Sequence, residues 1–171
     1  MRKRYSPKDI TAIFTELEGD NDRAAISVGG SMLEYALEQC LQSRFREAPD
    51  KGVESGILFV ETGILGTFWQ KIWAAYFLQL IGPDTRRNFD LIRLIRNAVS
   101  HDMNPVSFDG TPEIGNRCRE LAVTDEMGVM PSGLRGRFVL AVEFYSANLL
   151  LRTSDSDPVV SEAMKSLVDR I

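Results

Sequence analysis

The chain has 171 residues, with 20 Lys and Arg against 24 Asp and Glu, which gives a formal net charge of −4. Its length favours one domain, and its 44% hydrophobic residues can fill a core, which argues against a disordered chain. An acidic balance argues against broad non-specific DNA binding, and one histidine excludes any site that needs two histidines of one chain.

The pattern predicts helices joined by short loops, because apolar residues recur at three- and four-residue spacing and no segment alternates as a strand does. A first helix is expected to open at Ser6-Pro7 and to close at Gly19-Asp20-Asn21. A second should run from Asp22 to about Glu47. Its Gly29-Gly30 pair lowers helix propensity, so we predict a close crossing with another helix at that point.

The most hydrophobic helix is predicted to start at Gly66-Thr67 and to stop at Gly82-Pro83, after an ambiguous apolar piece around Ile57–Val60. A fourth long helix is predicted from Asp84 to His101. The apolar face expected for the helix that starts at Gly66-Thr67 consists of Phe68, Trp69, Ile72, Trp73, Tyr76 and Leu80.

Thr111-Pro112-Glu113 has the residue types of a helix start, and that short helix should end near Leu121. Residues 124–136 are predicted to be a loop, followed by a helix over Arg137–Leu151. A last helix, over about residues 158–171, should pack on the bundle or on a partner. Residues 1–171 are therefore expected to form one all-α domain, a bundle of about six or seven helices.

Neither a targeting signal nor a membrane span is expected. The basic start, Met1 to Arg4, is not followed by the apolar run of a secretion signal, and the longest apolar stretch, around Ile72–Ile81, is too short to cross a bilayer. These features favour a cytoplasmic protein. Cys40 and Cys118 lack metal-site spacing, so we expect no metal and no cofactor; the role of Cys118 stays open.

The segment Arg86–His101 carries the candidate chemistry. Placed on a helix, its apolar residues fill one half and its polar residues the other, with His101 at the border. Arg96 has no acidic residue three or four positions away, so its guanidinium needs a carboxylate from another helix, water or a bound anion. The polar half consists of Arg86, Asp90, Arg93, Arg96, Asn97 and Ser100.

This segment resembles two known protein families. Arg96-Asn97-Ala98-Val99-Ser100-His101 resembles the Arg-(Asn/Asp/His)-x-x-x-His signature of the HEPN superfamily of small helical bundles. A longer part, about residues 23–121, resembles the MltR family, named for a mannitol operon repressor. The matching pieces are the helix Arg23–Phe45, Leu65-Gly66-Thr67 with Lys71, Tyr76, Leu80 and Ile81, then Leu91-Ile92-Arg93, Arg96 to His101-Asp102, and Phe108 through Glu113-Ile114.

The second resemblance implies a transcriptional regulator without a DNA-reading module of its own. The sequence agrees, since it contains no helix-turn-helix with a basic recognition helix, no zinc-finger spacing and no basic zipper. We therefore expect regulation through a protein partner, without direct sequence-specific DNA binding. Candidate contact surfaces are the aromatic helix at Phe68–Tyr76 and the last helix at Val160–Ile171, although core packing is the simpler expectation for both.

The HEPN resemblance implies an alternative function, a metal-independent ribonuclease. In that case His101 would transfer protons, Arg96 would hold the phosphate and Asn97 would orient the substrate. Arg86 and Arg93 would widen the phosphate-binding strip, and Ser100 could assist. A homodimer would bring two histidines to one groove. The acidic chain and the lack of a second basic or aromatic RNA platform favour the regulatory alternative.

Overall fold

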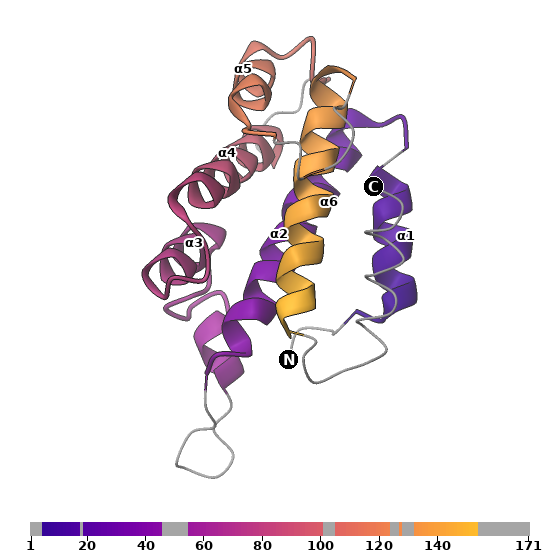
Figure 1. The fold of residues 1–171 in the computed structure, drawn as a ribbon. Coiled ribbons are helices and arrows are strands. Elements are labelled where there is room, and N and C mark those ends of the chain that lie inside the picture. Colours follow the sequence, from indigo (N-terminus) through magenta and orange to yellow (C-terminus); the bar gives the residue numbers. More distant parts are fainter. Residues whose placement is uncertain are drawn as a thin grey trace.

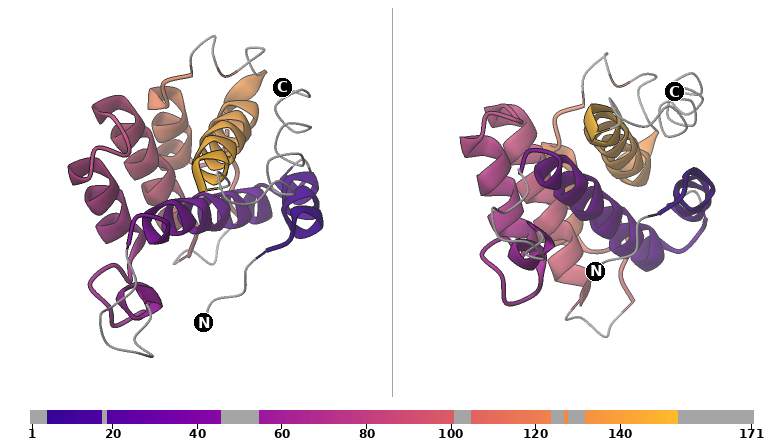
Figure 2. Two further views of the ribbon diagram at one scale, coloured as in Figure 1. Left: turned by 60° about the horizontal axis from the view of Figure 1, so that its bottom comes forward. Right: turned by 90° about the horizontal axis from the view of Figure 1, so that it is seen from below.

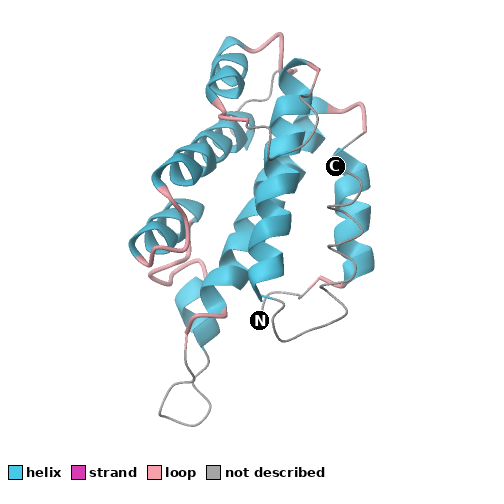
Figure 3. Cartoon of the chain, viewed as in Figure 1, coloured by secondary structure: helices cyan, strands magenta, loops and turns pink. Residues whose placement is uncertain are grey.

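A computed structural model describes residues 5–17, 19–45, 55–100, 105–123, 127 and 132–153. Those residues form six α-helices and one 3₁₀ helix and contain no strand (Figure 3), which confirms the predicted all-α bundle. The helices are α1 (Pro7–Leu17), α2 (Asp22–Gln42), η1 (Ser55–Phe59), α3 (Phe68–Phe77), α4 (Pro83–Ser100), α5 (Pro112–Glu120) and α6 (Gly133–Thr153).

Helix α2 forms the centre of the bundle. It packs most extensively on α6 and also contacts α1, α3, α4 and η1. Helix α1 lies on one side of this central pair, and α3, α4 and α5 lie on the other (Figures 1 and 2). Because α2 contacts both sides, its side chains decide how the two flanks are joined.

The Gly29-Gly30 pair marks the close helix crossings predicted from the sequence. A methyl group on Gly29 would lie 2.9 Å from Cε1 of Phe138 on α6, and one on Gly30 would lie 2.7 Å from Cδ of Arg96 on α4. Both distances are shorter than real carbon contacts. The prediction is confirmed, because the two glycines let α2 approach α6 and α4 at adjacent positions.

Several helices start where the sequence predicts them to start. Asn21 accepts a hydrogen bond from the backbone amide of Ala24 at the start of α2, and Thr67 with Gln70 forms a capping box at the start of α3. Thr111 precedes α5 as predicted, but its hydroxyl accepts from the amide of Ser107 instead of capping α5. The ambiguous piece around 57–60 falls largely in η1.

Other boundaries were predicted wrongly. Helix α2 ends at Gln42, and the amide of Ser43 closes it on Gln39. Helix α3 ends at Phe77 because Gln79 takes a left-handed backbone conformation, with φ 57°. Helix α6 begins at Gly133, well before the predicted start, so part of the expected loop is helical.

The face of α3 that the sequence predicts to be apolar is only partly buried in the structure. Phe68 and Ile72 are buried, but Trp69 is 51% exposed, and the side chain that is fully buried beside them is Lys71. The expected aromatic face therefore does not simply fill the core, and a charged residue takes part of the inner face. None of the described helices is long and apolar enough to cross a bilayer. The predicted helix at 158–171 lies outside the described residues.

Candidate functional site

Arg96 of α4 reaches across the bundle to α2. Its aliphatic stem lies on the backbone at Gly30, and its Nη1 lies 2.5 Å from Oε2 of Glu34, one helical turn further along α2. The sequence alone allows a carboxylate of another helix, water or a bound anion as the partner of this guanidinium. The structure supplies the carboxylate, from a residue 62 positions away in the chain.

Lys71 of α3 approaches the same carboxylate from the other side. Its Nζ lies 2.6 Å from Oε1 of Glu34 and 2.8 Å from Oε2 of Glu38, and its side chain is 0% exposed. Two cations and two carboxylates thus meet at one point. We call Glu34, Glu38, Lys71 and Arg96 the ion cluster; it joins α2, α3 and α4 and its formal charges cancel.

The ion cluster alters the acidity of Glu34. Burial alone would raise the pKa of this carboxyl, but the hydrogen bonds and positive charges of Lys71 and Arg96 outweigh burial and lower the pKa below its ordinary value. Glu34 is therefore held as a carboxylate. Because an ammonium in a dry interior is costly unless it is paired, the two carboxylates of α2 also account for the burial of Lys71.

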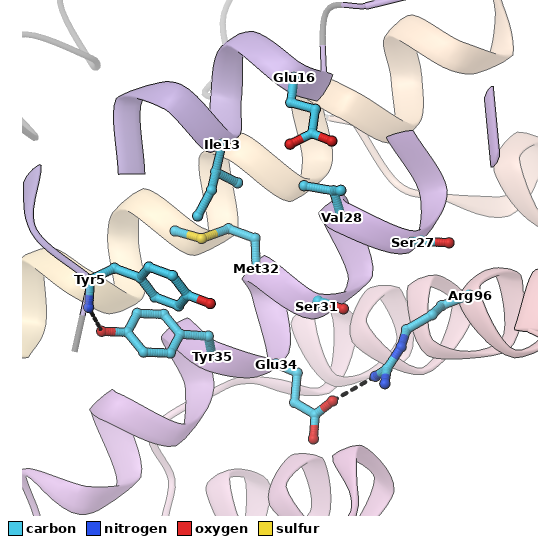
Figure 4. Close-up of a pocket in the computed structure, with 10 residues that line it drawn as sticks. All are labelled: Tyr5, Ile13, Glu16, Ser27, Val28, Ser31, Met32, Glu34, Tyr35 and Arg96. Atoms are coloured by element: carbon cyan, nitrogen blue, oxygen red, sulfur yellow. Dashed lines mark hydrogen bonds and ion pairs between the residues drawn. The ribbon is translucent and has the colours of Figure 1, made fainter. Parts of the chain in front are cut away.

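A cavity of about 640 Å³ lies beside the ion cluster, between α1, α2 and α4 (Figure 4). Glu34 and Arg96 form part of its wall, while Tyr5 and Tyr35 pack edge to face with ring centroids 4.8 Å apart. The remaining wall is mixed, with Ile13, Glu16, Ser27, Val28, Ser31 and Met32. Within the described part of the chain, no group of acidic, cysteine or histidine side chains could hold a metal ion.

The other predicted site residues do not converge on this cavity. Arg93 pairs with Asp90 of its own helix at 2.7 Å, and Arg86 lies over the ring of Trp73, 5.0 Å from its centroid. Asn97 and Ser100 are exposed, and the Ser100 hydroxyl donates to the carbonyl of Arg96. His101 lies outside the described residues.

The predicted set of site residues omits both carboxylates of the ion cluster. Glu34 and Glu38 are four apart, so they share one face of α2, and that spacing beside an apolar stripe is the signal that could have located them. In the sequence, only the family resemblance points to Lys71. Its burial could not be read from one helix, because its partners lie on another.

No protein-family model and no curated protein sequence matches this chain. Among solved structures, it is similar to a chain in the X-ray structure of the MtlR-HPr complex from Escherichia coli, with a TM-score of 0.63 and 19% sequence identity. The match covers 81% of this chain and 96% of that chain. The protein therefore shares the fold of that chain, which supports the resemblance to the MltR family at the level of fold.

Proposed function

We propose that this chain is a regulatory protein that acts by binding a protein partner, and that a protein like HPr is the partner to test first. The observation that carries the proposal is the shared fold, which extends over nearly the whole of a chain crystallised as an MtlR-HPr complex. A helical bundle that forms a complex with another protein needs an exposed surface and no catalytic group.

The arginines of α4 support a binding role over phosphate chemistry. Each has a partner within the chain: Arg86 lies over an aromatic ring, Arg87 pairs with Glu120, Arg93 with Asp90 and Arg96 with Glu34. A strip that binds RNA phosphates needs positive charge that is not already neutralised. Three of the four guanidiniums are therefore paired with a carboxylate, which reduces the positive charge that this helix can offer to a nucleic acid.

The ribonuclease alternative requires Arg96 to hold the reacting phosphate. In the structure this guanidinium is bound to Glu34, and the nearby carboxylate would repel a phosphate. None of the contacts made by the described residues favours the alternative, so it stays a hypothesis that depends on His101 and is tested by an RNA assay.

Isothermal titration calorimetry of the full chain with purified HPr tests the proposal. We expect saturable 1:1 binding with a Kd on the order of micromolar, as is usual for transient regulatory interactions. An unrelated protein of similar size and charge, and a random-sequence DNA duplex, serve as controls and should give no saturable heat. No binding of HPr at several hundred micromolar would contradict this choice of partner.

A further inference from the structure

The cavity beside the ion cluster has the dimensions of a site for a small molecule. Its volume of about 640 Å³ lies within the range of about 300–1,000 Å³ that is usual for ligand sites. Apolar and aromatic side chains form its wall together with a few hydroxyl and charged groups, which is also the usual composition of such sites. The charges and the rings on this wall indicate which class of ligand it can hold.

One carboxylate on the wall of the cavity has no counter-charge. Arg96 is bound to Glu34, whose other oxygen is bound to Lys71, and the formal charges of the ion cluster cancel. Glu16 of α1 forms no ion pair within the described part of the chain. Figure 4 shows its carboxylate turned from α1 toward Val28 of α2. The wall as a whole is therefore negative, which favours a cationic ligand over an anionic one.

Two tyrosines supply an aromatic part of the same wall. The backbone amide of Tyr5 donates to the hydroxyl of Tyr35 at 3.1 Å, and the two rings pack edge to face. Because these contacts already orient the rings, little side-chain freedom is lost when a ligand packs on them. The face of an aromatic ring attracts a cation. The tyrosines and Glu16 therefore favour the same sign of ligand charge.

Apolar side chains lie between the carboxylate and the tyrosines. Ile13 of α1 and Met32 of α2 line this part of the cavity, and Figure 4 shows both between Glu16 and Tyr5. They offer a hydrocarbon or aromatic group a surface from which water is released. A ligand with several positive charges would find only Glu16 as an unpaired carboxylate here. The wall therefore favours a single positive charge on an apolar body.

We propose that this cavity binds a small monoamine with an apolar or aromatic body. Its ammonium group pairs with Glu16, and its body packs between Ile13, Met32 and the two tyrosine rings. This site is independent of the proposed binding of HPr, because it lies within one chain and needs no contact with a second protein.

An amide NMR titration of the full chain with phenethylamine tests the site. We expect saturable shifts of the amide signals of Ile13, Val28 and Met32, with a Kd on the order of 1 mM for a ligand of this size. Hydrocinnamate and phenethyl alcohol carry the same phenyl body with an anionic and a neutral head. Both should bind about tenfold more weakly, because they lack the ion pair and the attraction between cation and ring.

Two variants of Glu16 test the role of the carboxylate. Glu16→Gln should raise the Kd of phenethylamine about fivefold, and Glu16→Lys should raise it more than about tenfold, because it places a like charge beside the ammonium group. Glu61→Lys is the matched control. It reverses the charge of an exposed carboxylate that does not line the cavity, so the Kd should stay unchanged. Amide spectra that match the wild type outside the cavity establish that the variants are folded.

Several results would overturn the proposal. Phenethylamine that causes no saturable shifts up to about 20 mM would show that the cavity does not bind such an amine. Equal binding of the three probes would show that only the apolar body is recognised, and tighter binding of hydrocinnamate would make Arg96 the ligand-binding charge. Unchanged binding to Glu16→Lys would also contradict it. Each of these results is obtained without HPr, so the proposed function is tested separately.

Discussion

Gly30 and Arg96 lie in contact where α2 crosses α4, and the absence of a side chain at Gly30 lets the arginine stem rest on the α2 backbone. From that position the guanidinium reaches Glu34, one turn along α2. The glycine, the arginine and the carboxylate together hold α2 and α4 in contact. The arginine that the family signature singles out is therefore part of the packing between helices.

Gly30→Ala should destabilise the fold although alanine favours helices. The new methyl group would lie 2.7 Å from Cδ and 2.9 Å from Cβ of Arg96, so the two helices must separate. We expect a loss of about 1–3 kcal/mol in the free energy of unfolding, measured by urea denaturation. Gly82→Ala is the matched control, since a methyl group there meets nothing within 4 Å. Equal stability of both variants would show that the crossing is not tight.

Lys71→Met should remove the cation that holds two buried carboxylates together. Glu34 and Glu38 both lie within 2.8 Å of the ammonium, so its loss leaves two carboxylates at close range with Arg96, bound to Glu34, as the remaining cation of the ion cluster. We expect the free energy of unfolding to fall by about 3–5 kcal/mol. Adding Glu38→Met to this variant should restore part of the loss, because it removes one of the two charges. A Lys71→Met variant as stable as wild type would contradict the packing role of the ion cluster.

Acid should weaken the fold through Glu34. Its pKa is lower in the folded than in the unfolded chain, whose ordinary value is 4.5, so the unfolded chain binds more protons as the pH falls. The stabilisation is therefore complete above about pH 4.5 and is lost as the pH falls through the folded pKa. Urea midpoints measured between pH 7 and pH 3 should fall more steeply for wild type than for Glu34→Gln. Parallel curves would show that Glu34 does not contribute.

Labelled single-stranded RNA should not be cleaved by this protein. The expected reason is that Arg96 is already bound to Glu34 and cannot hold a reacting phosphate. Wild type and His101→Ala, purified identically, are incubated with the RNA without metal ions, and products are resolved on a gel. Cleavage by wild type that disappears in His101→Ala would establish the ribonuclease instead.

Local signals predicted the elements better than their contacts. Asn21 and the Thr67–Gln70 box mark helix starts because a cap depends on residues within one turn. The end of α3 differs from the prediction because Gln79 takes a left-handed backbone conformation. The start of α6 differs because Arg135 in its first turn forms an ion pair with Asp22, which is distant in the sequence. A single sequence does not show which segments meet.

For the same reason, the sequence predicts only part of the candidate site. The sequence indicated that Arg96 needs a partner, but it could not identify Glu34 among the acids of other helices. Hydropathy also places Lys71 outside and Trp69 inside, whereas the structure buries the lysine between two carboxylates and exposes half of the tryptophan. Asn88 was missed for a similar reason: it is buried because Ala122 and Tyr145 provide its hydrogen bonds.

The central claim is that Arg96 serves as a structural cation joined to Glu34. A double-mutant cycle of Arg96→Ala, Glu34→Ala and the combined variant, followed by urea denaturation, tests it most directly. We predict a coupling of about 1–3 kcal/mol, with the double variant less destabilised than the sum of the single variants. A coupling of about zero, within roughly 0.3 kcal/mol, would contradict the claim and remove the objection that Glu34 raises to Arg96 as the phosphate ligand of the ribonuclease alternative.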